Sequence, residues 1–211
     1  MVIKRTTLID SIIKMMNKFD LLIDSFLDNW IGIDKNFISK NLSEGLQQNI
    51  VLLQKDGLMT AAGIGNEVVM NASQKMRGDK IYWMDKTHSN IFEQEFLSHV
   101  EDFIEYLNRT CYTGINGYEF HYAVYEAGSG YKRHKDQFKN DSNRKYSLIH
   151  YLNENWEEEN GGNLLVYQND SVQQIRPDSQ TAVLFKSDEM EHEVSKSNRD
   201  RMSVTGWLKR K

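Results

Sequence analysis

Six short runs of β-branched and aromatic residues follow one another through the second half of the chain, and they constrain its fold more than any other feature. Turn signals separate these runs, among them Gly128-Ser129-Gly130 and Gly161-Gly162. Short strands at such spacing are typical of a β-sandwich or a jelly roll. The expected strands cover residues 119–125, 146–152, 163–167, 181–185, 191–195 and 202–208.

The first half of the chain predicts helices that would support this β-rich core. Asp34 is expected to open the second of them and Asp56-Gly57 to close it, while Asn90 is placed to cap the third. Apolar side chains recur at helical spacing in residues 8–16, 38–53 and 91–107.

Two other segments of the first half do not have this helical spacing. Residues 21–27 are rich enough in apolar side chains to predict a short strand. Residues 57–78 are small and weakly periodic, which predicts a long mobile loop. Loops of this length often cover binding sites, and a plain surface loop is the alternative.

The chain shows no internal repeat and no proline-rich linker, since Pro177 is its single proline. We therefore expect one folding unit over residues 1–211. Residues 1–117 would supply mostly helical support, the first strands and the mobile loop 57–78. Residues 118–208 would form the jelly-roll core, which makes the predicted fold mainly β with supporting N-terminal helices.

Charge and composition exclude several classes of protein. A net charge of −4 and a pI near 5.9 give no broad basic field, so nucleic acid is not expected as a partner. The lone Cys111 excludes a disulfide scaffold and fits a reducing compartment such as the cytoplasm. The longest apolar runs have four residues, such as 50–53, so no membrane-spanning segment is expected. The sequence leaves the oligomeric state open.

One pair of side chains has the spacing of metal ligands. His134 and Asp136 lie two residues apart, and in an extended segment such residues project to the same side. His192, further along the chain, would add a second imidazole. Two imidazoles and one carboxylate are the ligand set of non-haem Fe(II) oxygenases, which leaves coordination positions open for substrates. His121 and His150 sit inside expected strands, where we interpret them as packed or cavity-lining residues.

Arg201 follows His192 by nine residues, across the turn signal 197–200. If the two flank a hairpin, they become neighbours on adjacent strands. Alternation would then put Thr205 and Trp207 on the same face as Arg201. A guanidinium that points into a barrel beside a metal site favours an anionic ligand that it can grip with two hydrogen bonds, and a dicarboxylic acid is such a ligand.

Three segments resemble the 2-oxoglutarate- and Fe(II)-dependent dioxygenases, in particular the prolyl 4-hydroxylase group with the oxygen-sensing, HIF-type enzymes and their bacterial relatives. Residues 76–84 read Met-Arg-Gly-Asp-Lys-Ile-Tyr-Trp-Met, similar to a stretch on the first barrel strands of that group. Residues 125–136 read Tyr-Glu-Ala-Gly-Ser-Gly-Tyr-Lys-Arg-His-Lys-Asp, and residues 151–156 read Tyr-Leu-Asn-Glu-Asn-Trp, followed by Gly161-Gly162-x-Leu164. The resemblance covers roughly residues 20 to 208.

This resemblance implies a double-stranded β-helix, the cupin-like form of the jelly roll, and it implies roles for eleven residues. Iron would be held by His134, Asp136 and His192, and the distal carboxylate of 2-oxoglutarate by Arg201 and the hydroxyl of Tyr151. The cosubstrate pocket would be lined by Tyr125, Thr205 and Leu164. The bound substrate would lie near Trp207, Arg144 and Tyr131. His121 and His150 depart from the residue types that the group carries, so cosubstrate affinity or oxygen reactivity is expected to differ.

The implied activity is 4-hydroxylation of a prolyl residue in a cytosolic protein, coupled to decarboxylation of 2-oxoglutarate to succinate and CO2. Fe(II), 2-oxoglutarate and O2 would take part, with ascorbate as a further cofactor, and proteins of the translation machinery are the first candidate targets. Two alternatives stay open: a relative acting on another residue or a small molecule, and a cupin-like metal-binding or sensor module without turnover. Arg201 with Tyr151 argues against the module, which needs no dicarboxylate clamp. A zinc hydrolase is disfavoured because the helical His-Glu-x-x-His motif is absent.

Overall fold

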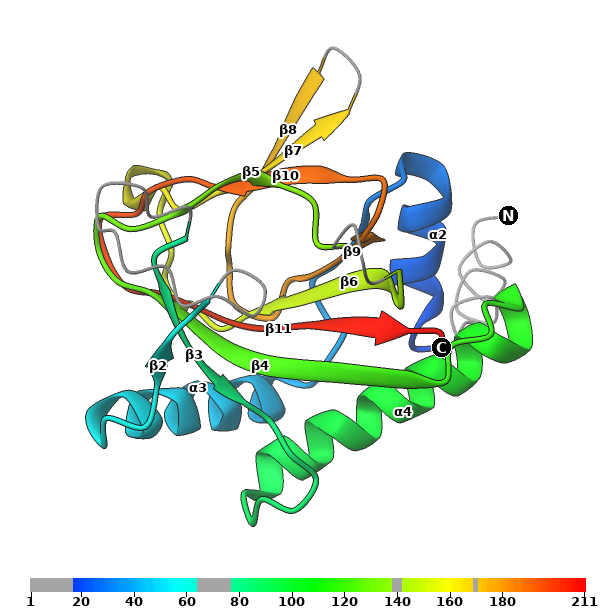
Figure 1. Cartoon of the computed structure of the whole chain (residues 1–211), viewed down its shortest axis with the longest axis horizontal. Helices are drawn as coiled ribbons and strands as arrows, with labels where there is room; N and C mark the ends of the chain where they lie inside the picture. The colour runs from blue at the N-terminus through cyan, green and yellow to red at the C-terminus, as the bar shows by residue number, and fades with distance from the viewer. Residues whose placement is uncertain (1–16, 64–76, 138–141, 169–170) are drawn as a thin grey trace, which may run out of the picture.

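Two antiparallel β-sheets face one another, and helices cover the outer face of the larger sheet (Figure 1). The computed structural model describes residues 17–63, 77–137, 142–168 and 171–211. The larger sheet has the order β1 (Gly32–Asp34), β9 (Ala182–Lys186), β6 (Arg144–Tyr151), β11 (Arg201–Lys209), β4 (Gly117–Tyr125), β3 (Asp79–Trp83) and β2 (Thr60–Ala61). The smaller sheet has the order β5 (Tyr131–His134), β10 (Glu191–Val194), β7 (Leu164–Gln168) and β8 (Ser171–Ile175). The predicted jelly roll is confirmed.

Alternation along the central strands divides the interior into two cores. On β6, Leu148 joins the core under the helices, whereas its neighbour Ile149 joins the core between the sheets. On β4, Val124 and Tyr125 separate in the same way. Successive side chains of a strand point to opposite faces, so the larger sheet is buried on both sides. The face between the sheets carries the side chains that matter for function.

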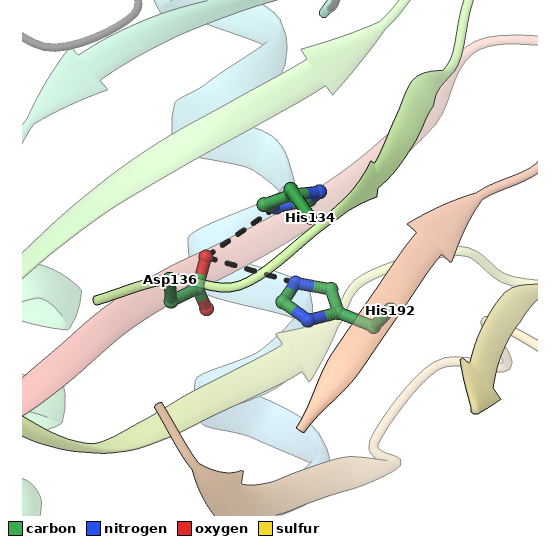
Figure 2. A group of neighbouring side chains, drawn as sticks. All are labelled: His134, Asp136 and His192. Carbon is green, nitrogen blue, oxygen red and sulfur yellow. Dashed lines mark ion pairs between the residues drawn. The ribbon is translucent and has the colours of Figure 1, made fainter. Parts of the chain in front are cut away.

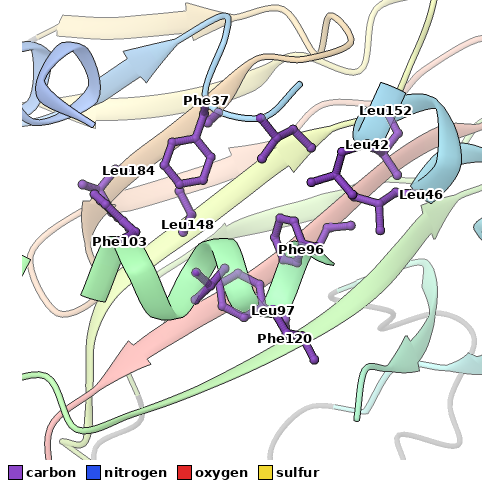
Figure 3. Packing of buried hydrophobic residues seen from close by; sticks show 14 of the residues in the cluster. Phe37, Leu42, Leu46, Phe96, Leu97, Phe103, Phe120, Leu148, Leu152 and Leu184 are labelled. Atoms are coloured by element: carbon purple, nitrogen blue, oxygen red, sulfur yellow. The ribbon is translucent and has the colours of Figure 1, made fainter. Parts of the chain in front are cut away.

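Helices α3 (Lys40–Lys55) and α4 (Ile91–Cys111) confirm the two predicted helices that lie within the described residues. The Asn90 side chain accepts hydrogen bonds from the backbone N–H groups of Phe92 and Glu93, as a helix cap does. Apolar residues of both helices pack onto the larger sheet. Figure 3 shows Leu46 of α3 and Phe96 of α4 together with Leu148 of β6. The predicted helix at 8–16 lies outside the described residues.

Two expectations for the first half are wrong, and a third lies mostly outside the described residues. Residues 21–27 belong to the helix α2 (Asp20–Asn29) because Leu22 and Ile23 are buried while Leu21 and Leu27 face solvent, a helical rather than an alternating pattern. Ser39, not Asp34, caps α3 by accepting a hydrogen bond from the N–H of Leu42, and Asp34 ends strand β1. The loop predicted over residues 57–78 contains the short strand β2, and its residues 64–76 lie outside the described part of the chain.

The expected hairpin between His192 and Arg201 is also wrong. β10 pairs with β5 and β7 in the smaller sheet, whereas β11 pairs with β4 and β6 in the larger one. The segment between them therefore crosses from one sheet to the other. His192 and Arg201 still line the same cavity, but from facing sheets.

His150 lies in the core under the helices, and its burial predicts how the stability of the protein depends on pH. Both of its ring nitrogens are buried without a hydrogen-bond partner among the described residues, and burial lowers its pKa from 6.5 to about 3. Between these pH values the unfolded chain binds a proton that the folded protein does not, so the free energy of unfolding falls as the pH falls. We expect His150→Leu to remain as stable as the wild type at pH 7 and to lose less stability between pH 6.5 and 4. Urea denaturation at several pH values measures this, and identical pH slopes for both proteins would contradict it.

Within the described residues, no helix is both long enough and apolar enough to cross a membrane.

Candidate active site

Three predicted metal ligands lie together between the sheets (Figure 2). His134 ends strand β5, Asp136 follows it, and His192 comes from the adjacent strand β10, where it is the register partner of His134. Asp136 Oδ1 lies 3.4 Å from His134 Nε2 and 3.6 Å from His192 Nε2. An octahedral ion with bonds of about 2.1 Å holds neighbouring donor atoms about 3.0 Å apart, so small shifts would bring all three onto one ion.

Backbone carbonyls fix which nitrogen of each imidazole is free. His134 Nδ1 lies 2.7 Å from the carbonyl oxygen of Lys132, and His192 Nδ1 lies 3.2 Å from that of Met190. A carbonyl oxygen accepts but cannot donate, so each Nδ1 carries a proton and Nε2 is the nitrogen left for a metal ion. Burial lowers the pKa of His192, which favours the neutral, metal-binding form.

The charge of Asp136 is stabilised in this buried position. Burial by itself raises the pKa of a carboxyl group, but His192, His134 and a hydrogen bond from Ser147 outweigh burial here. The pKa of Asp136 is therefore held well below its usual range. The carboxylate is ionised at every pH at which the protein is expected to work.

A cavity extends from this cluster towards Arg201. Arg201 is 1% exposed, and its Nε donates to the carbonyl oxygen of Gly162 at 2.9 Å. Its Nη2 and the hydroxyl of Tyr151 are both buried without a hydrogen-bond partner among the described residues. Buried polar groups are rarely left unpaired, so these two groups point to a missing acceptor.

Comparison with known proteins agrees with this arrangement. Residues 120–209 match the model of the 2OG-Fe(II) oxygenase superfamily, which covers β4 to β11 and therefore both sides of the cavity. Residues 120–209 are therefore similar to a 2OG-Fe(II) oxygenase domain. Proteins of this superfamily use Fe(II), 2-oxoglutarate and O2, the cofactor and cosubstrates that the sequence predicts.

The proteins that this chain resembles include prolyl hydroxylases. The chain is 26% identical over 188 residues to human Egl nine homolog 1, covering 84% of this chain and 43% of that protein. It is 25% identical over 183 residues to the mouse prolyl hydroxylase EGLN3, covering 82% of this chain and 75% of that protein. The chain thus spans about half the length of the Egl nine homolog 1 relatives that it matches.

Two solved structures share the fold over nearly the whole chain. A Pseudomonas putida prolyl-4-hydroxylase has a TM-score of 0.80 and 27% identity, over 90% of this chain and 97% of that one. A Trichoplax adhaerens prolyl hydroxylase, solved with a peptide of the oxygen degradation domain of hypoxia inducible factor, has a TM-score of 0.81 and 27% identity. That match covers 90% of this chain and 88% of that one.

The residues of the oxygenase cavity fit both groups that the superfamily uses. The two imidazoles and the carboxylate supply nitrogen and oxygen donors of the kind that Fe(II) takes. At the other end, the unpaired Nη2 of Arg201 and hydroxyl of Tyr151 match the oxygens of a carboxylate. Burial raises the pKa of Tyr151 against the opposing effect of Arg201, so the phenol keeps the proton that it would donate.

The other predicted pocket residues are found around the same cavity. Tyr125, Leu164 and Thr205 all line the cavity, from β4, β7 and β11 respectively. The ring of Tyr125 lies under the guanidinium of Arg201, with 5.2 Å from Cζ to the ring centre. These positions allow contact with a ligand between Arg201 and the metal cluster.

The predicted substrate residues surround the metal end of the cavity. Tyr131 stacks on His134 with ring centres 3.5 Å apart. Trp207 lines the cavity, and the guanidinium of Arg144 lies 3.4 Å from the centre of its ring. Arg144 also pairs with Glu119, at 2.8 Å. Flat surfaces of this kind form a wall against which a substrate ring can pack.

Several residues in or beside the cavity have no ligand role that the sequence assigned. Ser147 donates to Asp136 and stands on the inward face of β6 with Ile149 and Tyr151, so alternation along that strand was the available signal. His121 lines the cavity, which agrees with one of its two interpretations, but its Nδ1 has no partner among the described residues. Arg77 forms an ion pair with Asp79 and lies over the outer face of Tyr131.

Proposed function

We propose that this protein is a 2-oxoglutarate- and Fe(II)-dependent dioxygenase that hydroxylates C4 of a prolyl residue in a cytosolic protein. One observation carries the proposal. A cluster of two histidines and a carboxylate shares a cavity with a buried arginine whose Nη2 has no partner among the described residues. A metal-binding module needs the cluster but has no use for such an arginine.

In this proposal the chain binds and orients the reactants. Arg201 and the hydroxyl of Tyr151 would hold the distal carboxylate of 2-oxoglutarate, which directs its other end towards His134, Asp136 and His192. Bound Fe(II) supplies O2 activation, with electrons from the decarboxylation of 2-oxoglutarate to succinate and CO2. The apolar cavity wall, including Leu164 and Ile149, would keep water from the reacting atoms.

The choice of proline rests on the relatives and on the cavity wall. Relatives at 25–27% identity are prolyl hydroxylases, and one of the solved structures holds a peptide. The Trp207 ring suits a pyrrolidine ring, and Arg144 can hydrogen-bond the carbonyls of an extended chain. Proteins of the translation machinery are the first candidates for the target. The use of ascorbate stays a prediction.

The test uses cell extract incubated with the enzyme, Fe(II), 2-oxoglutarate and ascorbate. Peptides are then searched by mass spectrometry for one added oxygen. We expect a reproducible gain localised to proline that is lost with His134→Ala. Oxygen found on another residue or on a free metabolite would overturn the proline assignment and leave the oxygenase in place. Repeating the assay without ascorbate tests that cofactor.

A Trp207 variant is expected to weaken binding of the peptide substrate while leaving binding of 2-oxoglutarate nearly unchanged. We expect Trp207→Ala to raise the KM for the hydroxylated peptide about 5- to 30-fold, since packing against an aromatic face is worth about 1 to 2 kcal/mol. The Kd for 2-oxoglutarate should change less than about threefold. Trp30→Ala is the matched control because Trp30 is 60% exposed and lies outside this cavity. An unchanged peptide KM in Trp207→Ala would place the peptide elsewhere.

A further inference from the structure

The two oxygens of the Asp136 carboxylate have different surroundings. Oδ1 faces the Nε2 atoms of both His134 and His192, at 3.4 and 3.6 Å. Oδ2 accepts a hydrogen bond from the Ser147 hydroxyl, which is buried and 2.7 Å away. A carboxylate without such a bond is free to rotate and offer either oxygen, or both, to a metal ion.

The hydrogen bond to Oδ2 is the last of two successive hydrogen bonds, and both are donated towards Asp136. Ser147 Oγ lies 2.9 Å from Ser187 Oγ, and both residues are 0% exposed. An ionised carboxylate only accepts, so Ser147 must donate its one proton to Asp136. Ser187 must then donate to Ser147. Each hydroxyl is oriented by the next, and no water is needed to complete the chain.

Backbone hydrogen bonds hold this chain against the segment that carries the carboxylate. The N–H of Gln137 donates to the carbonyl oxygen of Ser187 at 3.1 Å. The N–H of Ser187 donates to the carbonyl oxygen of Lys145 at 3.1 Å, which ties the end of β9 to β6. Arg144 donates to the backbone carbonyl of Asp136 at 3.2 Å. Both hydroxyls are therefore attached to the larger sheet and reach across to the metal cluster.

We infer that Ser147 is a positioning residue for the metal centre, because its hydroxyl occupies Oδ2 and leaves Oδ1 as the oxygen that Asp136 presents. Ser187 orients that hydroxyl. This inference rests on the metal centre of the proposed function. With a single carboxylate oxygen committed to the metal, more of the coordination sphere stays open for a cosubstrate that binds through two oxygens.

Titration of the metal-free protein with Mn(II), with free Mn(II) measured by electron paramagnetic resonance, tests this directly. We expect Ser147→Ala to raise the Mn(II) Kd about 10- to 100-fold, the usual effect of removing a hydrogen-bond partner of a metal ligand. Ser187→Ala should have a smaller effect in the same direction. Ser147→Thr keeps the hydroxyl and should restore the Kd to within about threefold of the wild type.

Ser43→Ala is the matched control, since Ser43 is a buried serine on α3 whose hydroxyl pairs with Ser179. It should leave the Mn(II) Kd unchanged, and the melting temperatures of all the metal-free variants should show that each is folded. A Ser147→Ala Kd within twofold of the wild type would overturn this inference alone. Failure of the wild-type protein to bind Mn(II) would overturn the metal centre and the inference together.

Discussion

Replacing His134, Asp136 or His192 by alanine is expected to reduce 2-oxoglutarate turnover to the background of the assay. Each side chain supplies one of the three donor atoms that lie within 4.8 Å of one another, and two donors hold Fe(II) too weakly to keep it in the site. The measurement is succinate formation with Fe(II), together with the Mn(II) Kd of each variant. The three variants should nevertheless differ in their stability, because only Asp136 accepts a hydrogen bond from a buried serine.

Asp136→Ala should also lower the stability of the protein more than His134→Ala does. Removing the carboxylate leaves the buried Ser147 hydroxyl without its acceptor, which costs about 1 to 3 kcal/mol. Denaturant melts of the metal-free proteins measure this cost. His88→Ala is a control for histidine removal because His88 lies outside the cavity and pairs with Glu93. Full activity in any of the three ligand variants would contradict the metal assignment.

Arg201→Ala is expected to weaken 2-oxoglutarate binding about 30- to 1000-fold. A charge-assisted pair at a buried position is worth roughly 2 to 4 kcal/mol, and Arg201 is 1% exposed with an Nη2 that has no partner among the described residues. Calorimetric titration of the Mn(II)-loaded protein gives the Kd. 2-Oxoglutarate should also raise the melting temperature of the wild type but not that of the variant.

Two further variants separate the contributions at this end of the cavity. Arg201→Lys keeps a positive charge but loses the planar fork, so it should recover only part of the affinity. Tyr151→Phe removes a single hydroxyl and should cost about 1 kcal/mol, or roughly fivefold in Kd. Wild-type affinity in Arg201→Ala would show that another residue binds the distal carboxylate.

Local patterns predicted much of this structure. The six strands expected from residue 119 onward alternate between two buried faces or lie between clear turns, and each appears within two residues of its expected bounds. The short strands β5 and β8 were not predicted. α4 was predictable from two independent signals, a capping asparagine at its start and a helical apolar stripe along its length. Residues 21–27 were misassigned because apolar density was used where the period of the pattern should have decided.

Local sequence patterns did not show which strands pair across long distances in the chain. The separation of His192 from Arg201 was the same for a hairpin and for a crossing between sheets, and only the pairing of β10 with β5 distinguishes the two. His134 and Asp136 were identifiable because their ligand spacing is local. Ser187 was not, since it reaches Asp136 through Ser147 on another strand. A hydroxyl that reaches a metal ligand only through a second hydroxyl has no characteristic sequence spacing from that ligand.

The crossing between β10 and β11 has a mechanical consequence. It puts the two histidines of the metal cluster on the smaller sheet and Arg201 with Tyr151 on the larger one, so the two ends of the cavity belong to different β-sheets. A dicarboxylic acid anchored at both ends would join these sheets as a non-covalent cross-link. Amide hydrogens of β5 and β10 should then exchange more slowly with solvent when metal and cosubstrate are present together than with either alone. Binding of the cosubstrate would thus make the barrel more rigid before the target protein binds.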